Sequence, residues 1–273
     1  MAPAAASGLP EYEVYAIKYA HHERRARENF LGGDPHDAPM PLDFFVWLIR
    51  GAGREIVVDT GFSAAMAAKR RRNHLRCPAE ALRLLNVDAR SVRDVVVTHL
   101  HYDHAGNFDL FPGATFHVQD REMNYATGRY MCHECFRGAY EPEDVVSLVR
   151  RVYAGRVQFH DGDGEIAPGV SVHLIGGHTM GIQSVRVMTQ RGWLVLASDA
   201  SHFYANIEET RPFPIIWSVA DMVEGYAKLR ALAASAEHII PGHDPLVMAR
   251  YPAPSKALEG IVARLDVMPK IAS

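Results

Sequence analysis

The sequence has few cysteines, no long apolar run and no excess of charge of one sign. Three cysteines in 273 residues are too few, and odd in number, for a secreted disulfide framework. The longest purely apolar run, residues 44–49, is far shorter than the roughly 20 residues of a membrane-spanning helix. The formal net charge is −3, so no global field draws the protein to nucleic acid or to an anionic membrane. We therefore expect a soluble cytoplasmic protein.

The first ten residues, MAPAAASGLP, lack the basic and apolar regions of a signal peptide. We expect residues 1–10 to form a flexible N-terminal arm. Residues 11–273 are expected to form a single domain, because neither a low-complexity linker nor a repeat of 20–50 residues divides them. The composition, with 48% hydrophobic and 22% charged residues, is that of an ordinary globular protein.

Strand-like and helix-like segments come in two successive blocks, each running from strands to helices. Alternating or β-branched runs predict strands at 12–19, 43–50, 54–59, 92–97, 114–118, 171–175, 183–189, 193–198 and 237–240. Helical patterns predict helices at 63–72, 79–86, 143–153, 219–234 and 255–265, and a further helix that begins near 120. This order predicts one α/β sandwich rather than two independent domains.

Histidine is the one unusually frequent residue, with 15 copies, several of them clustered. The segment 99–104, His-Leu-His-Tyr-Asp-His, directly follows a buried β-branched strand. In an extended segment side chains two apart point the same way, so His99, His101 and Asp103 project together while His104 turns aside. That arrangement suits one metal ion bound by the first two residues and a second bound by the last two. A histidine-rich surface loop is the alternative interpretation.

Three further ligand-type residues each follow a predicted strand. His178 comes after Gly176-Gly177, Asp199 follows residues 194–198, and His243 follows Pro241-Gly242. Loops at strand ends are where binding and catalytic residues gather. Any one of these residues alone is a weak signal, but all of them with the cluster at 99–104 predict a metal site.

These motifs resemble the metallo-β-lactamase superfamily. The matching segments are Val58-Asp59-Thr60-Gly61, THLHYDHAG at 98–106, Gly177-His178-Thr179, Ser198-Asp199-Ala200 and Pro241-Gly242-His243. The resemblance implies an αββα sandwich with a dinuclear zinc site at one edge of the sheets. It also implies the ligand set: His99, His101 and His178 for one zinc, Asp103, His104 and His243 for the other, with Asp199 bridging them. Nitrogen and oxygen ligands suit Zn²⁺ best, although Mn, Fe or Co could occupy the site.

Within that superfamily the chain is most similar to the N-acyl-homoserine lactonase group. The similarity implies that a metal-bridging hydroxide opens the lactone ring of a small-molecule substrate, a quorum-quenching activity where that substrate is an acyl-homoserine lactone. 4-Pyridoxolactone hydrolysis, thioester hydrolysis, β-lactam opening and phosphodiester cleavage remain alternatives, as does a non-catalytic metal-binding protein. No nucleic acid or membrane partner is expected, and a homodimer is compatible with the sequence.

Three residues are candidates for roles beyond metal binding. Asp103 is the candidate to pass a proton onward, because its free oxygen would lie beside the hydroxide. Acyl-homoserine lactonases carry a tyrosine three residues after the bridging aspartate, where this chain has His202, with Tyr204 two residues further on. Tyr204 or His202 is therefore expected to donate a hydrogen bond to the carbonyl or tetrahedral oxyanion. Packing beside Phe203 is the alternative for Tyr204.

Three other segments have competing interpretations. The region 129–135, which contains Cys132 and Cys135, is a lid over the site, a third metal or redox site, or plain surface. The basic run 69–72 is interpreted as a solvated helix face rather than a nucleic-acid contact. Residues 213–217 either line an apolar pocket for an acyl chain or ring, or pack in the core.

Overall fold

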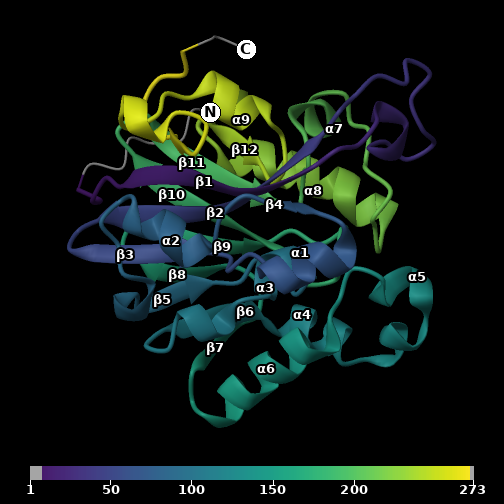
Figure 1. The fold of residues 1–273 in the computed structure, drawn as a ribbon, viewed down its shortest axis with the longest axis horizontal. Coiled ribbons are helices and arrows are strands. Elements are labelled where there is room, and N and C mark those ends of the chain that lie inside the picture. Colours follow the sequence, from purple (N-terminus) through teal and green to yellow (C-terminus); the bar gives the residue numbers. More distant parts are fainter. Residues whose placement is uncertain (1–7, 271–273) are drawn as a thin grey trace.

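The computed structural model describes residues 8–270, so the expected N-terminal arm falls largely outside the described residues. The first sheet has the strand order β13-β1-β2-β3-β5-β6-β7, with β4 paired to β1, and the second has the order β12-β11-β10-β9-β8. Figure 1 shows the strands in the middle of the molecule and the helices around them. The predicted αββα sandwich is confirmed.

The strands have the following bounds. The first sheet contains β1 (Glu13–His22), β2 (Leu42–Gly51), β3 (Arg54–Val58), β4 (Asn73–His74), β5 (Asp94–Val96), β6 (Thr115–Gln119), β7 (Val157–His160) and β13 (Val262–Arg264). The second contains β8 (Gly164–Ala167), β9 (Val170–Leu174), β10 (Gln183–Thr189), β11 (Gly192–Ser198) and β12 (Ile239–Pro241).

Helices cover the outer faces of both sheets. The first sheet and its edge carry α1 (Ala64–Arg70), α2 (Pro78–Arg83), α3 (Tyr102–Ala105), α4 (Asp120–Ala126), α5 (Glu134–Arg137) and α6 (Pro142–Tyr153). The outer face of the second carries α8 (Val219–Leu232) and part of α7 (Tyr204–Glu208). Helix α9 (Leu246–Arg250) instead contacts β13 and packs at the core between the sheets. Short 3-10 turns lie at 26–28, 89–91, 108–110, 129–132, 236–238 and 256–258. Among residues 8–270, no helix has the length and apolar character needed to cross a membrane.

Strand β2 shows why the two sheets stack. Successive side chains of a strand point to opposite faces, and here both faces are apolar. Phe44, Val46 and Leu48 face the helix-covered outer core, whereas Phe45, Trp47 and Ile49 face the core between the sheets. Burial of such side chains stabilises the fold by about 1.5–3 kcal/mol each. An uninterrupted apolar run is therefore buried on both sides of the sheet, as in other layered α/β folds.

Parallel pairs bring several strand ends to one edge. Strand β3 runs parallel to β5, with Val58 opposite Val96, and β11 runs parallel to β12, with Ser198 opposite Pro241. The chain that leaves β3 and β5 therefore emerges close together, as does the chain that leaves β11 and β12. These four ends position most of the residues described below, and the turn after β9 positions one more, His178.

The helix predicted for 255–265 is wrong. That segment forms a 3-10 turn at 256–258 and then β13, which pairs antiparallel with β1 and places Val262 opposite Ile17. Gly260 has a φ of +72° and ends the turn. Val262 packs in the outer core and Ala263 between the sheets, so burial on alternate faces overrides the local helical pattern. Strands β7 and β8 and helices α7 and α9 were not predicted either.

Candidate metal centre

The seven predicted ligands lie on turns that follow strand ends. His99 and His101 follow β5, and Asp103 and His104 stand on the single turn of α3. The other three follow β9, β11 and β12 (His178, Asp199 and His243). All seven side chains are buried, and His99 is fully enclosed. The structure thus brings together residues up to 144 positions apart in the sequence, from His99 to His243.

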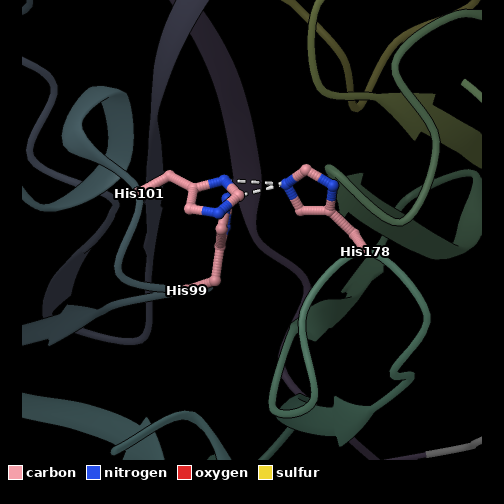
Figure 2. Close-up of side chains that lie close together, drawn as sticks. All are labelled: His99, His101 and His178. Atoms are coloured by element: carbon pink, nitrogen blue, oxygen red, sulfur yellow. Dashed lines mark hydrogen bonds between the residues drawn. The ribbon is translucent and has the colours of Figure 1, made fainter. Parts of the chain in front are cut away.

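Three histidines form the first group of converging nitrogens. His178 Nε2 lies 3.2 Å from His99 Nε2 and 2.9 Å from His101 Nδ1. Figure 2 shows the rings of His99 and His101 approaching from one side and that of His178 from the other. Zn–N bonds are about 2.0–2.1 Å long. Two imidazole nitrogens bound to the same zinc ion therefore lie at separations comparable to the 2.9 Å and 3.2 Å between these nitrogens.

Asp199 lies between this group and a second one. Its Oδ2 is 3.4 Å from His178 Nε2, whereas its Oδ1 is 3.2 Å from His104 Nε2 and 3.0 Å from His243 Nε2. Asp103 Oδ2 lies 3.6 Å from His104 Nε2 and 3.7 Å from His243 Nε2. The two oxygens of one carboxylate therefore face two separate sets of ligand atoms, the arrangement that a bridging carboxylate requires.

The hydrogen bonds of the second group show that these side chains suit a cation. His104 Nδ1 donates to Asp59 Oδ2 (2.7 Å), and His243 Nδ1 donates to the carbonyl oxygen of Asp43 (2.8 Å). In each neutral imidazole Nε2 then carries a lone pair. Both lone pairs face Asp199 Oδ1, itself only an acceptor, and His104 Nε2 and Asp199 Oδ1 are buried without a hydrogen-bond partner. A divalent cation among them would satisfy all three atoms, so the residues fit a metal ion.

In the group of three histidines, burial also favours the neutral form that metal binding needs. Burial first, and the neighbouring histidines second, hold the pKa of His99 and of His101 well below the usual histidine value. Both imidazoles are therefore neutral near pH 7 and can donate a lone pair. Burial likewise lowers the pKa of His178. Its Nδ1 donates to the carbonyl oxygen of Ile215 (2.7 Å), which leaves Nε2 free to bind a metal ion.

Two buried carboxylates outside the ligand set hold the ligand turns. Asp59 Oδ1 accepts from Thr98 N (2.7 Å), while its Oδ2 accepts from the Thr98 hydroxyl and from His104. Asp59 has a φ of +63°, a left-handed conformation of the kind that gathers at functional sites. The motif at 58–61 was recognised in the sequence, but only the structure shows this contact.

Glu122 is the second such carboxylate, and sequence reasoning missed it. Its Oε1 accepts from Leu100 N (2.9 Å) and from the Tyr140 hydroxyl (2.9 Å). Its Oε2 accepts from the Thr179 hydroxyl (2.5 Å) and from Gly181 N (3.2 Å). Glu122 therefore ties the turn of His99 and His101 to the turn of His178. A glutamate in the first turn of a surface helix carries no signal of this role in the sequence.

The turn after β12 approaches Asp199 so closely that it needs glycine. A Cβ atom on Gly242 would lie 2.6 Å from Asp199 Oδ1 and 2.7 Å from the Ser198 carbonyl carbon. Any side chain there would displace the carboxylate, which gives the glycine of the Pro241-Gly242-His243 motif a physical reason.

The structure separates the two residues predicted to assist the carbonyl. His202 is buried, stacks on Phe213 with ring centroids 3.4 Å apart, and places Nε2 2.9 Å from Asp199 Oδ2. Burial lowers the pKa of His202 to about 3, so its ring is neutral. Tyr204 instead packs in the core between the sheets, and the Arg250 guanidinium covers its ring at 3.9 Å. The structure brings His202 to the site and does not bring Tyr204 there.

A cavity of about 560 Å³ opens above the ligands. Asp103, His202 and four of the other predicted ligands (His101, His178, Asp199 and His243) lie on its floor. Cys135 and Phe136 from α5 form part of its rim, so the segment that contains two of the three free cysteines, Cys132 and Cys135, borders the site. Ile215 and Ile216 line the cavity, whereas Phe213 and Trp217 pack against His202 and Tyr130. Figure 1 shows α5 extending from the body of the molecule.

The basic run at 69–72 differs from its prediction. Lys69 is mostly exposed and pairs with Glu141 at 2.6 Å, as expected for a helix surface. Arg70 and Arg72 instead line the cavity. The interpretation of the whole run as a solvated face is therefore wrong, because α1 ends at Arg70 and the chain then turns towards the site.

Comparisons with known proteins agree on the family. The model of the metallo-beta-lactamase superfamily matches residues 43–249. An N-acyl homoserine lactonase AttM of Azorhizobium caulinodans is 30% identical over 235 residues, which cover 78% of this chain and 85% of that protein. An AttM protein of Rhizobium radiobacter is 29% identical over 241 residues, which cover 80% and 88% of the two chains.

Solved structures share the fold. The crystal structure of a quorum-quenching N-acyl homoserine lactone lactonase superposes with a TM-score of 0.71 and 22% identity, and covers 86% of this chain and 92% of that one. AidC, a dizinc quorum-quenching lactonase, has a TM-score of 0.65 and 17% identity over 87% of this chain and 89% of its own. At these identities the likeness concerns the fold alone.

Proposed function

The chain belongs to the metallo-β-lactamase superfamily, and from that premise we propose that it is a dizinc hydrolase that opens the ring of an N-acyl homoserine lactone or a related lactone. One observation carries the proposal: seven buried ligand side chains converge, with the two oxygens of Asp199 facing two separate ligand groups. The similarity to curated lactonases favours a lactone over the other esters, thioesters and amides that such a centre could attack.

The chemistry that two zinc ions supply when bound is Lewis acidity, which makes hydroxide available near about pH 7 and polarises a carbonyl oxygen. We assign His99, His101 and His178 to one ion, Asp103, His104 and His243 to the other, and Asp199 to both. Mn, Fe or Co could replace zinc in such a nitrogen and oxygen ligand set.

Asp103 is the proposed proton carrier. It lies on the cavity floor, and the Tyr19 hydroxyl fixes its turn by donating to the Asp103 backbone oxygen (2.8 Å). A carboxylate oxygen of Asp103 takes up the proton released in the attack and gives it to the alkoxide that leaves the ring.

His202 is the proposed donor to the carbonyl or tetrahedral oxygen, because it reaches the cavity and Tyr204 does not. Its neutral ring has one N–H, on Nε2, which lies 2.9 Å from Asp199 Oδ2 and would turn to the substrate oxygen once Asp199 holds the metal ions. Removal of such a donor lowers kcat by about 10²–10³-fold. We therefore expect His202→Phe to lower kcat on a lactone to this extent and Tyr204→Phe to leave it unchanged. A loss of activity in the Tyr204 variant alone would exchange the two assignments.

A substrate panel tests the function. Protein loaded with zinc is assayed near neutral pH with a series of N-acyl homoserine lactones, 4-pyridoxolactone, a thioester, a cephalosporin and bis-p-nitrophenyl phosphate. We expect the highest kcat/KM on a lactone, loss of activity after chelation, and recovery when zinc is returned. Turnover of the thioester, cephalosporin or phosphodiester without turnover of any lactone would overturn the proposal. A quorum-quenching role follows if the preferred lactone is an acyl-homoserine lactone.

A further inference from the structure

The cavity above the ligands carries more positive charge than a neutral lactone needs. Outside the ligand set, three arginines line it, Arg24 from the chain after β1 and Arg70 and Arg72 from the end of α1. Among the described residues that line the cavity, Glu28 is the one carboxylate that is not a proposed ligand. N-acyl homoserine lactones with alkyl chains have no charge for these arginines to meet.

The charge of Arg70 is neutralised by a contact within the fold. Its Nη2 and Nε lie 2.6 Å and 3.0 Å from Glu141 Oε1, and its guanidinium stacks over the Tyr102 ring at 4.0 Å. This ion pair joins the end of α1 to the start of α6. Arg70 therefore has its counter-charge and serves as a structural support.

Arg72 has no counter-charge. Its Nε donates to the Tyr102 hydroxyl (3.0 Å), and its Nη1 lies 2.8 Å from the Arg70 carbonyl oxygen and 3.1 Å from His22 Nε2. Within residues 8–270 no carboxylate oxygen lies within 4.0 Å of its nitrogens, and Nη2 has no hydrogen-bond partner. Because Tyr102 stands between His101 and Asp103 in the chain, Arg72 is held directly beside the ligand turn.

Arg24 also has no carboxylate in direct contact, although the Glu28 charge is near it. Its Nη2 donates to the Glu28 carbonyl oxygen (2.5 Å), and no carboxylate of the described chain lies within 4.0 Å of its nitrogens. Glu28 is exposed and uses Oε2 to cap its own turn by accepting from Arg25 N (2.8 Å). Burial lowers the pKa of Arg24 below the usual arginine value; the Glu28 carboxylate opposes this shift, and the charge of Arg72 adds to it, so the two cations lie close enough to repel each other.

Half-buried cations without an anion are costly, and their free N–H groups suit an oxyanion. We infer that Arg24 and Arg72 form a subsite for an anionic group of the substrate, a carboxylate or a phosphate, and that the preferred lactone carries such a group. The inference rests on the proposed function, because it places the anionic group beside a lactone held above the ligand cluster. Guanidinium groups bind both oxyanions with two parallel hydrogen bonds.

Matched pairs of lactones test the inference. The first pair is 5-oxotetrahydrofuran-2-carboxylate and its neutral carboxamide, and the second is N-glutaryl-homoserine lactone and its terminal carboxamide. A third pair, 6-phosphoglucono-δ-lactone and glucono-δ-lactone corrected for spontaneous opening, distinguishes phosphate from carboxylate. We expect the zinc-loaded protein to prefer the anionic member of at least one pair by about 10- to 100-fold in kcat/KM, the effect of a charged hydrogen-bond pair. Added NaCl should reduce this preference by screening.

Substitutions of single arginines test whether Arg24 and Arg72 cause the preference for the anionic lactone. Arg72→Gln and, independently, Arg24→Gln should each lower the ratio of anionic to neutral kcat/KM at least about 10-fold. Arg72→Gln keeps a donor for the Tyr102 hydroxyl, and zinc content and circular dichroism verify its fold. Arg71→Gln is the matched control, because Arg71 is the neighbouring exposed arginine outside the cavity lining, so its loss removes the same net charge. The ratio should not change in this control.

The outcomes separate this inference from the proposed function. A protein that opens the neutral lactones as fast as their anionic partners is a lactonase without an anion subsite, and the inference fails alone. An equal fall of the ratio in Arg71→Gln would show a general field rather than a subsite, which also overturns it. If no lactone of any pair is opened, the proposed function fails, and the inference fails with it.

Discussion

The two walls of the cavity are built in different ways. The inner wall is the cluster of seven proposed metal ligands, five of which line the cavity. All seven are buried, and three of the histidines are fixed through a hydrogen bond of the nitrogen that faces away from the centre. The outer wall includes Arg24, Arg72, residues 135, 136, 138 and 139, and residues 214–216. There, Cys135 is exposed, and Ile215 keeps 43% of its surface accessible.

The difference separates chemistry from selectivity. The inner wall is held by both sheets and by two buried carboxylates, so its geometry tolerates little change. The outer wall is made of loops and of side chains with few fixed partners, where substitutions redirect binding at a low cost in stability. Changes in the inner wall should therefore abolish activity, whereas changes in the outer wall should alter which substrates are accepted.

The largest effect is expected where both ligand groups depend on one residue. The purified protein should contain about two zinc ions per chain. In Asp199→Ala both ligand groups lose an oxygen, so zinc content should fall sharply and kcat/KM should drop by a factor on the order of 10³ or more. Elemental analysis and lactone hydrolysis measure the two quantities. The exposed Asp161→Ala is the control. An active protein without metal would end the metallohydrolase interpretation.

Asp103 separates metal binding from proton transfer within the inner wall. Asparagine keeps an oxygen that can bind zinc but cannot carry the proton, so Asp103→Asn should keep much of its metal and lose about 10²–10⁴-fold in kcat on alkyl lactones. The loss should be smaller on aryl esters and thioesters, whose leaving groups depart without protonation. Equal losses on both classes would indicate positioning of the hydroxide instead, and full activity with both metals present would remove Asp103 from the mechanism.

Glu122 tests whether the inner wall depends on its supports. In Glu122→Gln an NH₂ group replaces one oxygen that accepts two hydrogen bonds, so the two ligand turns lose a shared anchor. We expect zinc affinity to fall about 10- to 100-fold, the usual effect of losing a residue that orients metal ligands. Competition with a chromogenic chelator measures the affinity. Unchanged affinity together with a lowered thermal midpoint would limit Glu122 to a role in stability.

The smallest effect on activity is expected from substitutions of residues that lie behind the outer wall of the cavity. Tyr130 packs against Trp217 with ring centroids 4.4 Å apart and supports the segment that carries Cys135 and Phe136. Tyr130→Ala, Met131→Ala and His133→Ala should change the relative kcat/KM across the substrate panel a few-fold, about 1 kcal/mol or less in binding, while zinc content stays constant. Identical relative rates in all three variants would show that this segment does not influence the site.

The core and the ligand turns were the most predictable parts of the molecule. The apolar run of β2 and the β-branched run before His99 identify strands because burial on both faces leaves a contiguous pattern in the sequence. The terminal segment was mispredicted for the opposite reason. Its last strand, β13, has three residues and exists only because β1 offers it a partner, and local propensity does not record such a partner.

The pattern of strands and helices determined the α/β class, and the short motifs directly after strongly patterned strands identified the seven candidate ligands through their resemblance to the metallo-β-lactamase superfamily. Only the tertiary structure decided that His202 rather than Tyr204 faces the site, that Glu122 ties two ligand turns together, and that Arg72 lines the cavity. The physical reason is how far apart in the sequence the contacting residues lie. A ligand motif is local, whereas the direction of a side chain and its hydrogen-bond partners depend on segments dozens of residues away, which packing alone brings together.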